Sequence, residues 1–321
     1  MSARKKVTIV GSGQTGGMMV HRLAEKNICD IVIQDISEQE SVARGIPPAQ
    51  HHGKALDIMQ GASVAGFETQ IVATDGWDET RDSDVVVITS GAPRKPGMSR
   101  EDLLKGNQDI VGEKAACIAK YSPNAVIIVF ANPMDVMCHV AMKESGFPRE
   151  RVIGQGGMLD SERFRTFLSM ELGVSQRDVH AYVLGGHTDT TMVPIVSQAR
   201  VGGMPLESLI PPDRLEAIVK RTMGGGAELV ALYKTGSAFF APAVATVAMV
   251  ESILGDQKRL FPCAVLLKGE YGVKDVFCGT IVKVGSGGAE KVYEMPVSGE
   301  EKEKIVTACN ATRDLLGVLS A

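Results

Sequence analysis

The stretch that decides the fold is KVTIVGSGQTGG, at residues 6–17. A run of β-branched residues ends in Gly11-x-Gly13-x-x-Gly16, and a helical pattern over residues 15–27 follows at once. This glycine spacing is a weak signal alone and a strong one between a strand and a helix. Gly11 suits a tight turn, Gly13 lets a pyrophosphate approach the backbone, and Gly16 lets the helix approach the strand. A plain glycine turn is the alternative. We predict dinucleotide binding at Gly11, Ser12, Gly13, Gln14, Thr15 and Gly16.

The second signal is Asp35, at the end of the next predicted strand, CDIVIQD. An acid at this separation from the glycines accepts hydrogen bonds from the adenosine ribose hydroxyls. Its charge would repel the 2′-phosphate of NADP, and the residues that follow, Ile36 and Ser37, supply no arginine. We therefore predict NAD as the cofactor. The alternative for Asp35 is a residue that only forms the turn.

Outward from this motif, strand and helix patterns alternate. SDVVVIT at residues 83–89 and NAVIIVF at 124–130 are apolar throughout, as in strands of a parallel sheet covered on both faces. A long helix is predicted between them, over residues 101–121. This rhythm predicts an α/β fold, a Rossmann doubly wound parallel sheet, over residues 1–150.

After about residue 150 the rhythm changes. Helical patterns occur at about 212–234 and 240–255, and residues 264–295 read as an antiparallel meander. The last segment starts with a capping signal, Ser298 followed three residues on by Glu301. We predict an α+β catalytic and substrate domain over residues 151–321.

Composition excludes several classes of function. The net charge of −4 gives no basic surplus for nucleic acid or anionic lipid. No apolar run is long enough to span a membrane, and the N-terminus leads straight into a strand, so we expect no signal peptide. None of the six cysteines forms a C-x-x-C pair, which favours a reduced, cytoplasmic protein without a zinc site.

One loop carries an unexpected pair of cations. In TSGAPRKPGMSRED, residues 89–102, Arg94 and Arg100 lie among prolines and glycines that break helix and strand. Lone loop arginines are usually solvated. In an acidic chain, however, a local cationic cluster suggests a small anionic ligand.

Five stretches carry a resemblance to a known family. VGSGQTGG, SGAPRKPGMSREDLL, FANPMDV, GMLDSERFR and GGHTDTTMVP together resemble the lactate/malate dehydrogenase family nearly end to end, and within it malate dehydrogenases built on the lactate dehydrogenase pattern. The resemblance implies a reversible, NAD-dependent oxidation of L-malate to oxaloacetate, as in the tricarboxylic acid cycle. It also implies a homo-oligomer, a tetramer or alternatively a dimer.

The resemblance also implies roles for single residues. His187 matches the catalytic histidine, Asp160 its carboxylate partner, and Arg163 the arginine that grips the C1 carboxylate of the substrate. Arg100 matches the arginine that polarises the carbonyl, and Arg94 the position where malate enzymes have arginine and lactate enzymes glutamine. Further matches are Asn132 near nicotinamide and substrate, Ser237 in the substrate pocket, and Asn107, Phe130 and Ala131 along the cofactor.

These roles make chemical sense. Histidine titrates near neutrality and can take the hydroxyl proton, while an acid on its other nitrogen holds the tautomer. Arg163 and Arg94 would each hold one carboxylate of oxaloacetate as the loop closes, leaving Arg100 for the carbonyl. The alternatives are a lactate or other 2-hydroxy-acid dehydrogenase, an NAD-dependent glycosidase, which would need a metal, and a non-catalytic NAD-binding module.

Three departures from the family pattern stand out. His51 and His52 lengthen a proline-rich region beyond the GIPQGKALD-like form, and we interpret them as a solvated insertion rather than metal ligands. Thr188 replaces a glycine, so the turn after His187 is expected to differ if it needs positive φ. Gly224–Gly226 interrupt a helical pattern and predict a kink.

Overall fold

The computed structural model describes residues 4–45, 48–92 and 100–319. Its strands form one 12-stranded sheet in the order β3-β2-β1-β4-β5-β6-β10-β11-β7-β8-β9, with β12 beside β11. The strands are β1 Lys6–Val10, β2 Asp30–Gln34, β3 Ile71–Thr74, β4 Val85–Ile88, β5 Val126–Val129, β6 Val152–Gly154, β7 Val179–Gly185, β8 Met192–Val201, β9 Met204–Pro205, β10 Arg259–Lys268, β11 Lys274–Gly285 and β12 Gly288–Tyr293. The α-helices are α1 Gln14–Lys26, α2 Glu38–Ala43, α3 His51–Gln60, α4 Ala62–Ala65, α5 Arg100–Tyr121, α6 Met134–Ser145, α7 Gly156–Leu172, α8 Pro212–Met223, α9 Gly225–Tyr233, α10 Phe240–Leu254 and α11 Gly299–Leu319.

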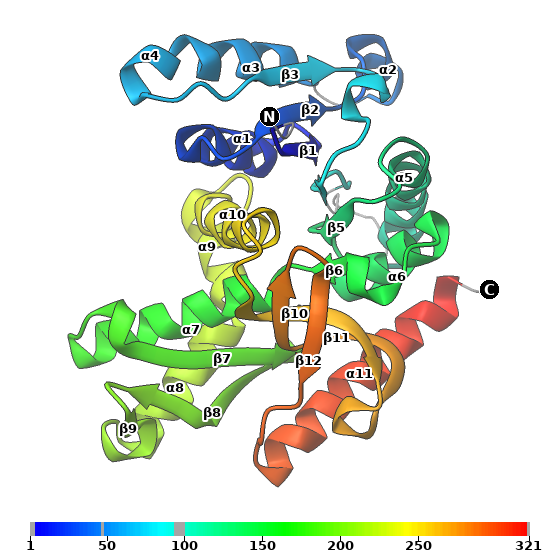
Figure 1. The fold of residues 1–321 in the computed structure, drawn as a ribbon. Helices are drawn as coiled ribbons and strands as arrows, with labels where there is room; N and C mark the ends of the chain where they lie inside the picture. Colours follow the sequence, from blue (N-terminus) through cyan, green and yellow to red (C-terminus); the bar gives the residue numbers. More distant parts are fainter. Residues whose placement is uncertain (1–3, 46–47, 93–99, 320–321) are drawn as a thin grey trace.

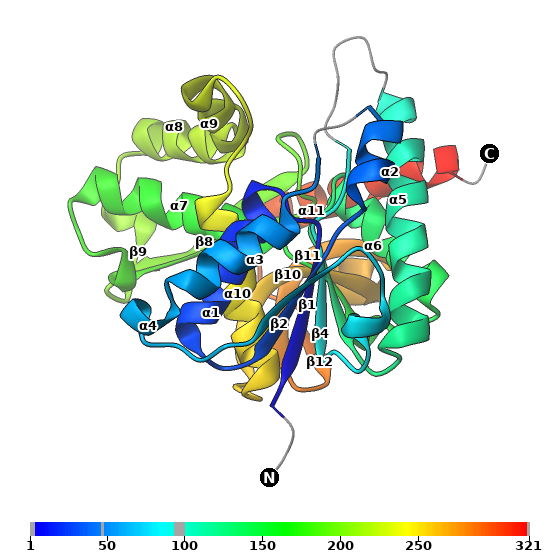
Figure 2. The same cartoon turned by 90° about the horizontal axis from the view of Figure 1, so that it is seen from above.

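Strands β1 to β6 form the predicted parallel sheet, with helices on both faces (Figures 1 and 2). Alternate residues of each strand enter different cores. In β4, Val85 and Val87 pack with α1 and α10, while Val86 and Ile88 pack with α5 and α6. Burial on both faces explains why these strands read as continuous apolar runs. The Rossmann prediction is confirmed.

The rest of the chain forms the predicted α+β unit, in which β10, β11 and β12 are the antiparallel meander. The cap of α11 is reciprocal. The Glu301 amide donates to Ser298 Oγ at 3.2 Å, and the Ser298 amide donates to Glu301 Oε2 at 2.8 Å. The same carboxylate accepts the amide of Ser197 at 3.0 Å, which fastens the last helix to β8. None of the helices in the described residues is long and apolar enough to cross a membrane.

Glycines lie at two short junctions of the sheet, one between its parallel and antiparallel parts and one within the antiparallel part. β6 meets β10 where Gly154 pairs with Ala264, and β11 meets β7 where Gly279 pairs with Gly185. A Cβ atom on Gly154 would lie 2.1 Å from Met134 Sδ, and one on Gly279 would lie 2.7 Å from the Gly185 carbonyl oxygen. Gly154 therefore leaves room for α6 against the sheet, and Gly279 lets β11 and β7 approach each other.

Two expectations about local structure have clear outcomes. The predicted kink is confirmed, because Gly224 separates α8 from α9 where a single helix over 212–234 was expected. The solvated insertion is wrong for His51. This residue begins α3 and is only 2% exposed, while the next residue, His52, is exposed. Both rings face Asp75, at the end of β3, and this contact, distant in sequence, orders the segment.

Candidate active site

A cavity of about 410 Å³ lies where the carboxyl end of β5 meets α7, the turn after β7 and the segment before α10. Its size is typical of a small-molecule site. The structure brings five predicted residues to its wall: Phe130, Asn132, Arg163, His187 and Ser237. The other lining residues are Leu103, Pro133, Leu159, Thr188, Asp189, Met192, Gly226, Val230, Ala238 and Pro242.

His187, Asp160 and Arg163 form one connected group. His187 Nδ1 lies 2.6 Å from Asp160 Oδ2, and Arg163 Nη1 donates to Asp160 Oδ1 at 3.0 Å. Asp160 and Arg163 are three residues apart on α7, so both side chains lie on one helix face. Asp160 is 1% exposed and forms the floor beneath the two residues that reach the cavity. The arrangement leaves His187 Nε2 as the nitrogen available to a ligand.

The surroundings of His187 favour its protonated form. Burial alone would lower the pKa of His187. The charge of Asp160, its hydrogen bond and the charge of Asp135 outweigh burial and raise that pKa above its ordinary value. The imidazole can thus accept a proton and be stabilised as an imidazolium.

Asp135 is a residue that the sequence reasoning missed. It lies in the first turn of α6, and its Oδ2 accepts the backbone N–H of His187 at 2.9 Å. Asp135 Oδ1 is buried without a hydrogen-bond partner among the described residues, and burial raises the pKa of Asp135 to about 6. Its position in FANPMDV was the only available signal, because a backbone contact across 52 residues leaves no spacing pattern.

The glycine turn after β1 has the geometry that a pyrophosphate needs. Gly11 has φ +106°, and a Cβ there would lie 2.6 Å from Thr89 Oγ1. A Cβ on Gly16 would lie 2.0 Å from the Gly11 carbonyl oxygen, so α1 is pressed against the strand end. Gly13 is exposed, with nothing within 4 Å of its Cβ position. No side chain caps α1, so its first N–H groups face this space with the positive end of the helix dipole.

Asp35 lies at the end of β2, beside this turn. Its Oδ2 accepts the Ser12 amide at 2.6 Å, which ties the acid to the glycine turn. Lys54, also missed from sequence, reaches over from α3 and donates to the carbonyl oxygens of Ser12 and Gly13. Burial lowers the pKa of Lys54, and the charge of Asp35 partly opposes this. The open Gly13, the uncapped helix and an acid one strand away fit the pyrophosphate and ribose of NAD.

Several other predicted residues do not line the cavity or lie outside the described residues. Asn107 is buried and does not line the cavity. Its Oδ1 accepts the Ala92 amide at 2.7 Å, and its Nδ2 donates to the Asn132 carbonyl at 2.6 Å, so it braces two loops. Ala131 is buried beside Phe130. Arg94 and the side chain of Arg100 lie outside the described residues. Thr188 is not among the residues with positive φ, so it fits its turn without strain.

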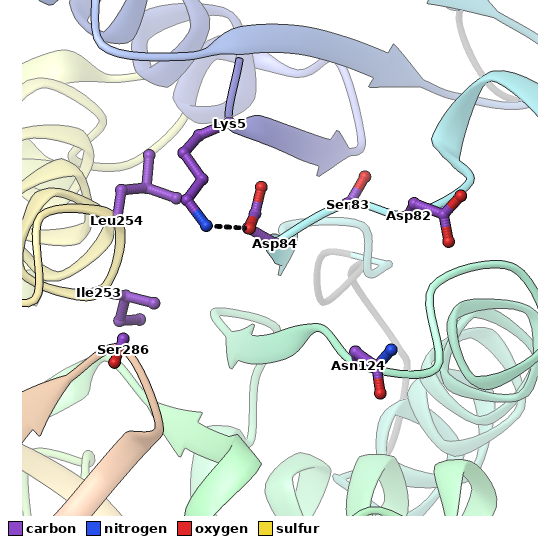
Figure 3. Close-up of a pocket in the computed structure, with 8 residues that line it drawn as sticks. All are labelled: Lys5, Asp82, Ser83, Asp84, Asn124, Ile253, Leu254 and Ser286. Atoms are coloured by element: carbon purple, nitrogen blue, oxygen red, sulfur yellow. Dashed lines mark hydrogen bonds and ion pairs between the residues drawn. The ribbon is translucent and has the colours of Figure 1, made fainter. Parts of the chain in front are cut away.

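A second pocket lies at the opposite edge of the sheet, at the amino ends of the parallel strands (Figure 3). Lys5 and Asp84 face each other there, with Nζ 2.7 Å from Oδ1. Asn124 and Ser286 complete its polar wall. None of the predicted site residues lines this pocket. The predicted site residues that line a pocket thus lie at the carboxyl edge, where open α/β sheets bind their ligands.

Comparison with known proteins agrees with this geometry. Residues 5–154 match the lactate/malate dehydrogenase NAD binding domain, and residues 157–314 match the lactate/malate dehydrogenase alpha/beta C-terminal domain. A malate dehydrogenase of Bacillus mycoides is 47% identical over 316 residues, 98% of each chain.

Solved structures are similar over the same length. Malate dehydrogenase from Salinibacter ruber has 42% identity and a TM-score of 0.90, covering 98% of this chain and 97% of its own. A lactate dehydrogenase from Cryptosporidium parvum, complexed with lactic acid and nicotinamide adenine dinucleotide, has 38% identity and a TM-score of 0.92, covering 100% and 99%. With both halves of the chain matched and the predicted His187, Asp160 and Arg163 in contact, the chain belongs to the lactate/malate dehydrogenase family.

Proposed function

We propose that this chain is an NAD-dependent malate dehydrogenase, which oxidises L-malate reversibly to oxaloacetate. The observation that carries the proposal is the single carboxylate of Asp160, which holds both His187 and Arg163 at the cavity wall. The Asp160 carboxylate thus aligns His187, which transfers the proton, with Arg163, which binds a substrate carboxylate. The 47% identity to a malate dehydrogenase over 98% of the chain supports the choice of substrate.

His187 handles the proton. In malate oxidation its unprotonated Nε2 takes the proton of the substrate hydroxyl, and in the reverse direction the imidazolium returns it to the ketone oxygen. Asp160 keeps the proton of the other nitrogen in place and stabilises the imidazolium. NAD, when bound, supplies the acceptor for the hydride. Asp135 holds the backbone of His187, so the ring is fixed at both ends.

Arginines hold the dicarboxylate. Of the three guanidinium nitrogens of Arg163, only Nη1 has a hydrogen-bond partner among the described residues. The remaining N–H groups are left to bind one substrate carboxylate at the wall. Arg94 holds the second carboxylate, and Arg100 stabilises the charge that develops on the carbonyl oxygen. Asn132 and Ser237, on the same wall, complete the substrate pocket.

The cofactor lies along the carboxyl edge of the parallel sheet. The glycine turn and the first turn of α1 bind its pyrophosphate, and Asp35 binds the adenosine ribose. Phe130 and Asn132, after β5, line the substrate cavity and would hold the nicotinamide beside it. The cofactor domain thus covers the predicted residues 1–150 and extends through β6 to Gly154, and the catalytic domain follows it up to residue 321.

The decisive experiment compares initial rates of NADH oxidation with oxaloacetate and with pyruvate, for wild type and Arg94→Gln. Pyruvate presents a methyl group where oxaloacetate has its second carboxylate. Leaving Arg94 buried and unpaired costs about 2–5 kcal/mol, so wild type should prefer oxaloacetate roughly 30-fold to several-thousand-fold. The variant should lose most of this preference.

Lys95→Gln is the matched control, because it removes the neighbouring cation of the same segment. It should keep the preference for oxaloacetate. Equal or better reduction of pyruvate by wild type would instead indicate a lactate or broader 2-hydroxy-acid dehydrogenase. Binding of NADH without turnover of either acid would indicate a non-catalytic NAD-binding module.

We also propose a cytoplasmic homo-oligomer, a tetramer or alternatively a dimer. Exposed apolar side chains on α9 and α10 support self-association, among them Leu232, Phe240 and Val244, which are 69%, 53% and 49% exposed. All six cysteines are unpaired, as in a reducing compartment. Light scattering across a concentration series gives the number of subunits, and a monomer at all concentrations would contradict the proposal.

A further inference from the structure

Three potential metal ligands converge at the outer edge of the parallel sheet. His51 and His52 begin α3, and Asp75 directly follows β3. The Nε2 atoms of the two histidines lie 2.7 Å and 3.1 Å from the same oxygen, Asp75 Oδ1. Their ring centroids are 4.2 Å apart. Two imidazole nitrogens from one element thus meet a carboxylate oxygen from another at hydrogen-bond distance.

These separations are close to those of a metal site. Ligand atoms at about 2.0–2.1 Å from a tetrahedral ion lie about 3.3 Å from one another. The two nitrogen–oxygen distances in the protein fall a few tenths of an ångström short of that value, and all three ligand atoms lie within 4.8 Å of one another. An ion could enter with a small outward movement of exposed side chains. His52 and Asp75 are the exposed members, at 64% and 49% of their side-chain areas.

The surroundings hold the ligands in place. His51 is 2% exposed, so its ring is fixed by packing. The Asp75 backbone is anchored because β3 pairs with β2 through Thr74, whose carbonyl accepts the Asp35 amide at 3.2 Å. A fixed imidazole and a carboxylate on an anchored backbone are already positioned for an ion, which reduces the ordering that binding requires.

We propose that His51, His52 and Asp75 bind one divalent transition-metal ion, with zinc as the best fit. Two imidazole nitrogens and one carboxylate oxygen suit zinc, cobalt or nickel, whereas magnesium and calcium prefer all-oxygen sites. Three protein ligands leave a fourth position for water, towards the exposed side of the cluster. The bound ion ties α3 to β3, one strand away from Asp35.

One feature limits the affinity. Ligation through Nε2 places the remaining ring proton of His51 on Nδ1, which is buried without a partner among the described residues. Ligating histidines ordinarily donate this proton to a carboxylate or carbonyl, and loss of that contact weakens metal binding by about 10- to 100-fold. We therefore expect an affinity well below that of structural zinc sites.

The test is a titration of the full chain, freed of metal by a chelator, with zinc chloride in a calorimeter. We expect one ion per chain, and a rise in melting temperature with zinc concentration. Cobalt(II) should bind in its place and show the intense visible absorption of a tetrahedral site. Magnesium at the same concentrations should give neither signal.

Variants assign the ion to the cluster. His52→Ala and Asp75→Asn change exposed side chains and should each weaken zinc binding at least tenfold, while metal-free melting temperatures stay near that of wild type. His21→Ala, an exposed histidine on α1 outside the cluster, is the matched control and should bind zinc like wild type. Absence of stoichiometric zinc binding in wild type overturns the proposal. So does a wild-type affinity and stoichiometry in both cluster variants, because the ion then binds elsewhere.

Discussion

The wall around His187 and the glycine turn at residues 11–16 use polar groups in opposite ways. At the wall, side chains contact one another and are buried: Asp160 accepts from both of its neighbours, and Asp135 holds the backbone. At the turn, the N–H groups at the start of α1 and the space over Gly13 are left open. Proton transfer needs groups oriented in advance, whereas cofactor binding needs donors without internal partners. Substitutions should therefore affect turnover at one region and affinity at the other.

The largest effect is expected from Asp160→Asn. Loss of the charge leaves His187 without its stabilising partner, and kcat should fall roughly 100-fold to 10,000-fold while NADH affinity stays unchanged. Malate oxidation needs unprotonated His187, so the rate of wild type falls as pH drops through the raised pKa of this residue. In the variant that limb should shift to lower pH. Steady-state rates across pH, with NADH fluorescence titration, measure both.

Glu162→Gln is the control for that variant. Glu162 lies two residues along the same helix and pairs with Arg165 rather than with the His187 group. It should turn over malate like wild type. If Asp160→Asn lost NADH affinity as well, the separation between the two regions would not hold.

An intermediate effect is expected from Gly13→Ala. The backbone φ of −56° suits alanine, and no atom lies within 4 Å of the new methyl group, so melting temperature should not change. The methyl occupies the space predicted for the pyrophosphate, and NADH binding should weaken roughly tenfold or more, about 1.4 kcal/mol per decade. Gly317→Ala, which adds a methyl to open space on α11, should leave NADH binding unchanged. Unaltered NADH affinity in Gly13→Ala would place the cofactor elsewhere.

The smallest effect on activity is expected from Asp135→Asn. The amide oxygen still accepts the His187 N–H, but the negative charge that helps to raise the pKa of His187 is gone. The acid limb of malate oxidation should therefore move to lower pH. Asp135→Ala, which also removes the acceptor, should in addition lower kcat. Equal kcat in the two variants would show that the hydrogen bond to the His187 N–H does not contribute to turnover.

A comparison of wild type with Asp135→Asn also tests how this carboxylate affects the free energy of unfolding. The pKa of Asp135 is raised to about 6 in the fold, from an unfolded value of about 3.9, so the folded chain binds this proton more tightly. Wild type therefore gains stability from this group as pH falls from about 6 to about 4, by at most about 3 kcal/mol. The Asn variant should lack that gain. Urea unfolding at pH 4 and pH 7 gives the free energy of unfolding of both proteins, and the difference in this free energy between wild type and variant should change with pH.

Most of the fold could be predicted because its signals are local. Apolar runs such as residues 124–130 require cover on both faces, and Ser298 with Glu301 specifies the start of α11 within one turn. The glycines 11, 13 and 16 could be predicted for the same reason, since each acts on its own turn. The contact between Asp160 and His187 needed the family resemblance, because 27 residues separate them. The roles of Arg163, Arg94 and Arg100 needed it as well, because spacing alone assigns none of them.

The features that could not be predicted from the sequence depend on contacts between distant segments. His51 is ordered by Asp75 from another strand, so the local proline-rich composition suggested a solvated loop and hid the start of α3. Asp135 and Lys54 act on backbone atoms of other elements, at 52 and 42 residues' distance. Every residue offers the same backbone N–H and carbonyl groups, so a contact to the backbone does not require a particular residue type at that position. The sequence pattern therefore does not indicate which side chain makes the contact.

The glycine junction between β6 and β10 has one more consequence. The cofactor turn and the His187 turn lie in different halves of the chain, yet both halves are parts of one hydrogen-bonded sheet, joined where Gly154 of β6 meets Ala264 of β10. Main-chain pairing, rather than side-chain packing alone, therefore connects the half that carries the glycine turn to the half that carries His187. A side chain at Gly154 would collide with Met134, so a substitution there would disturb this connection.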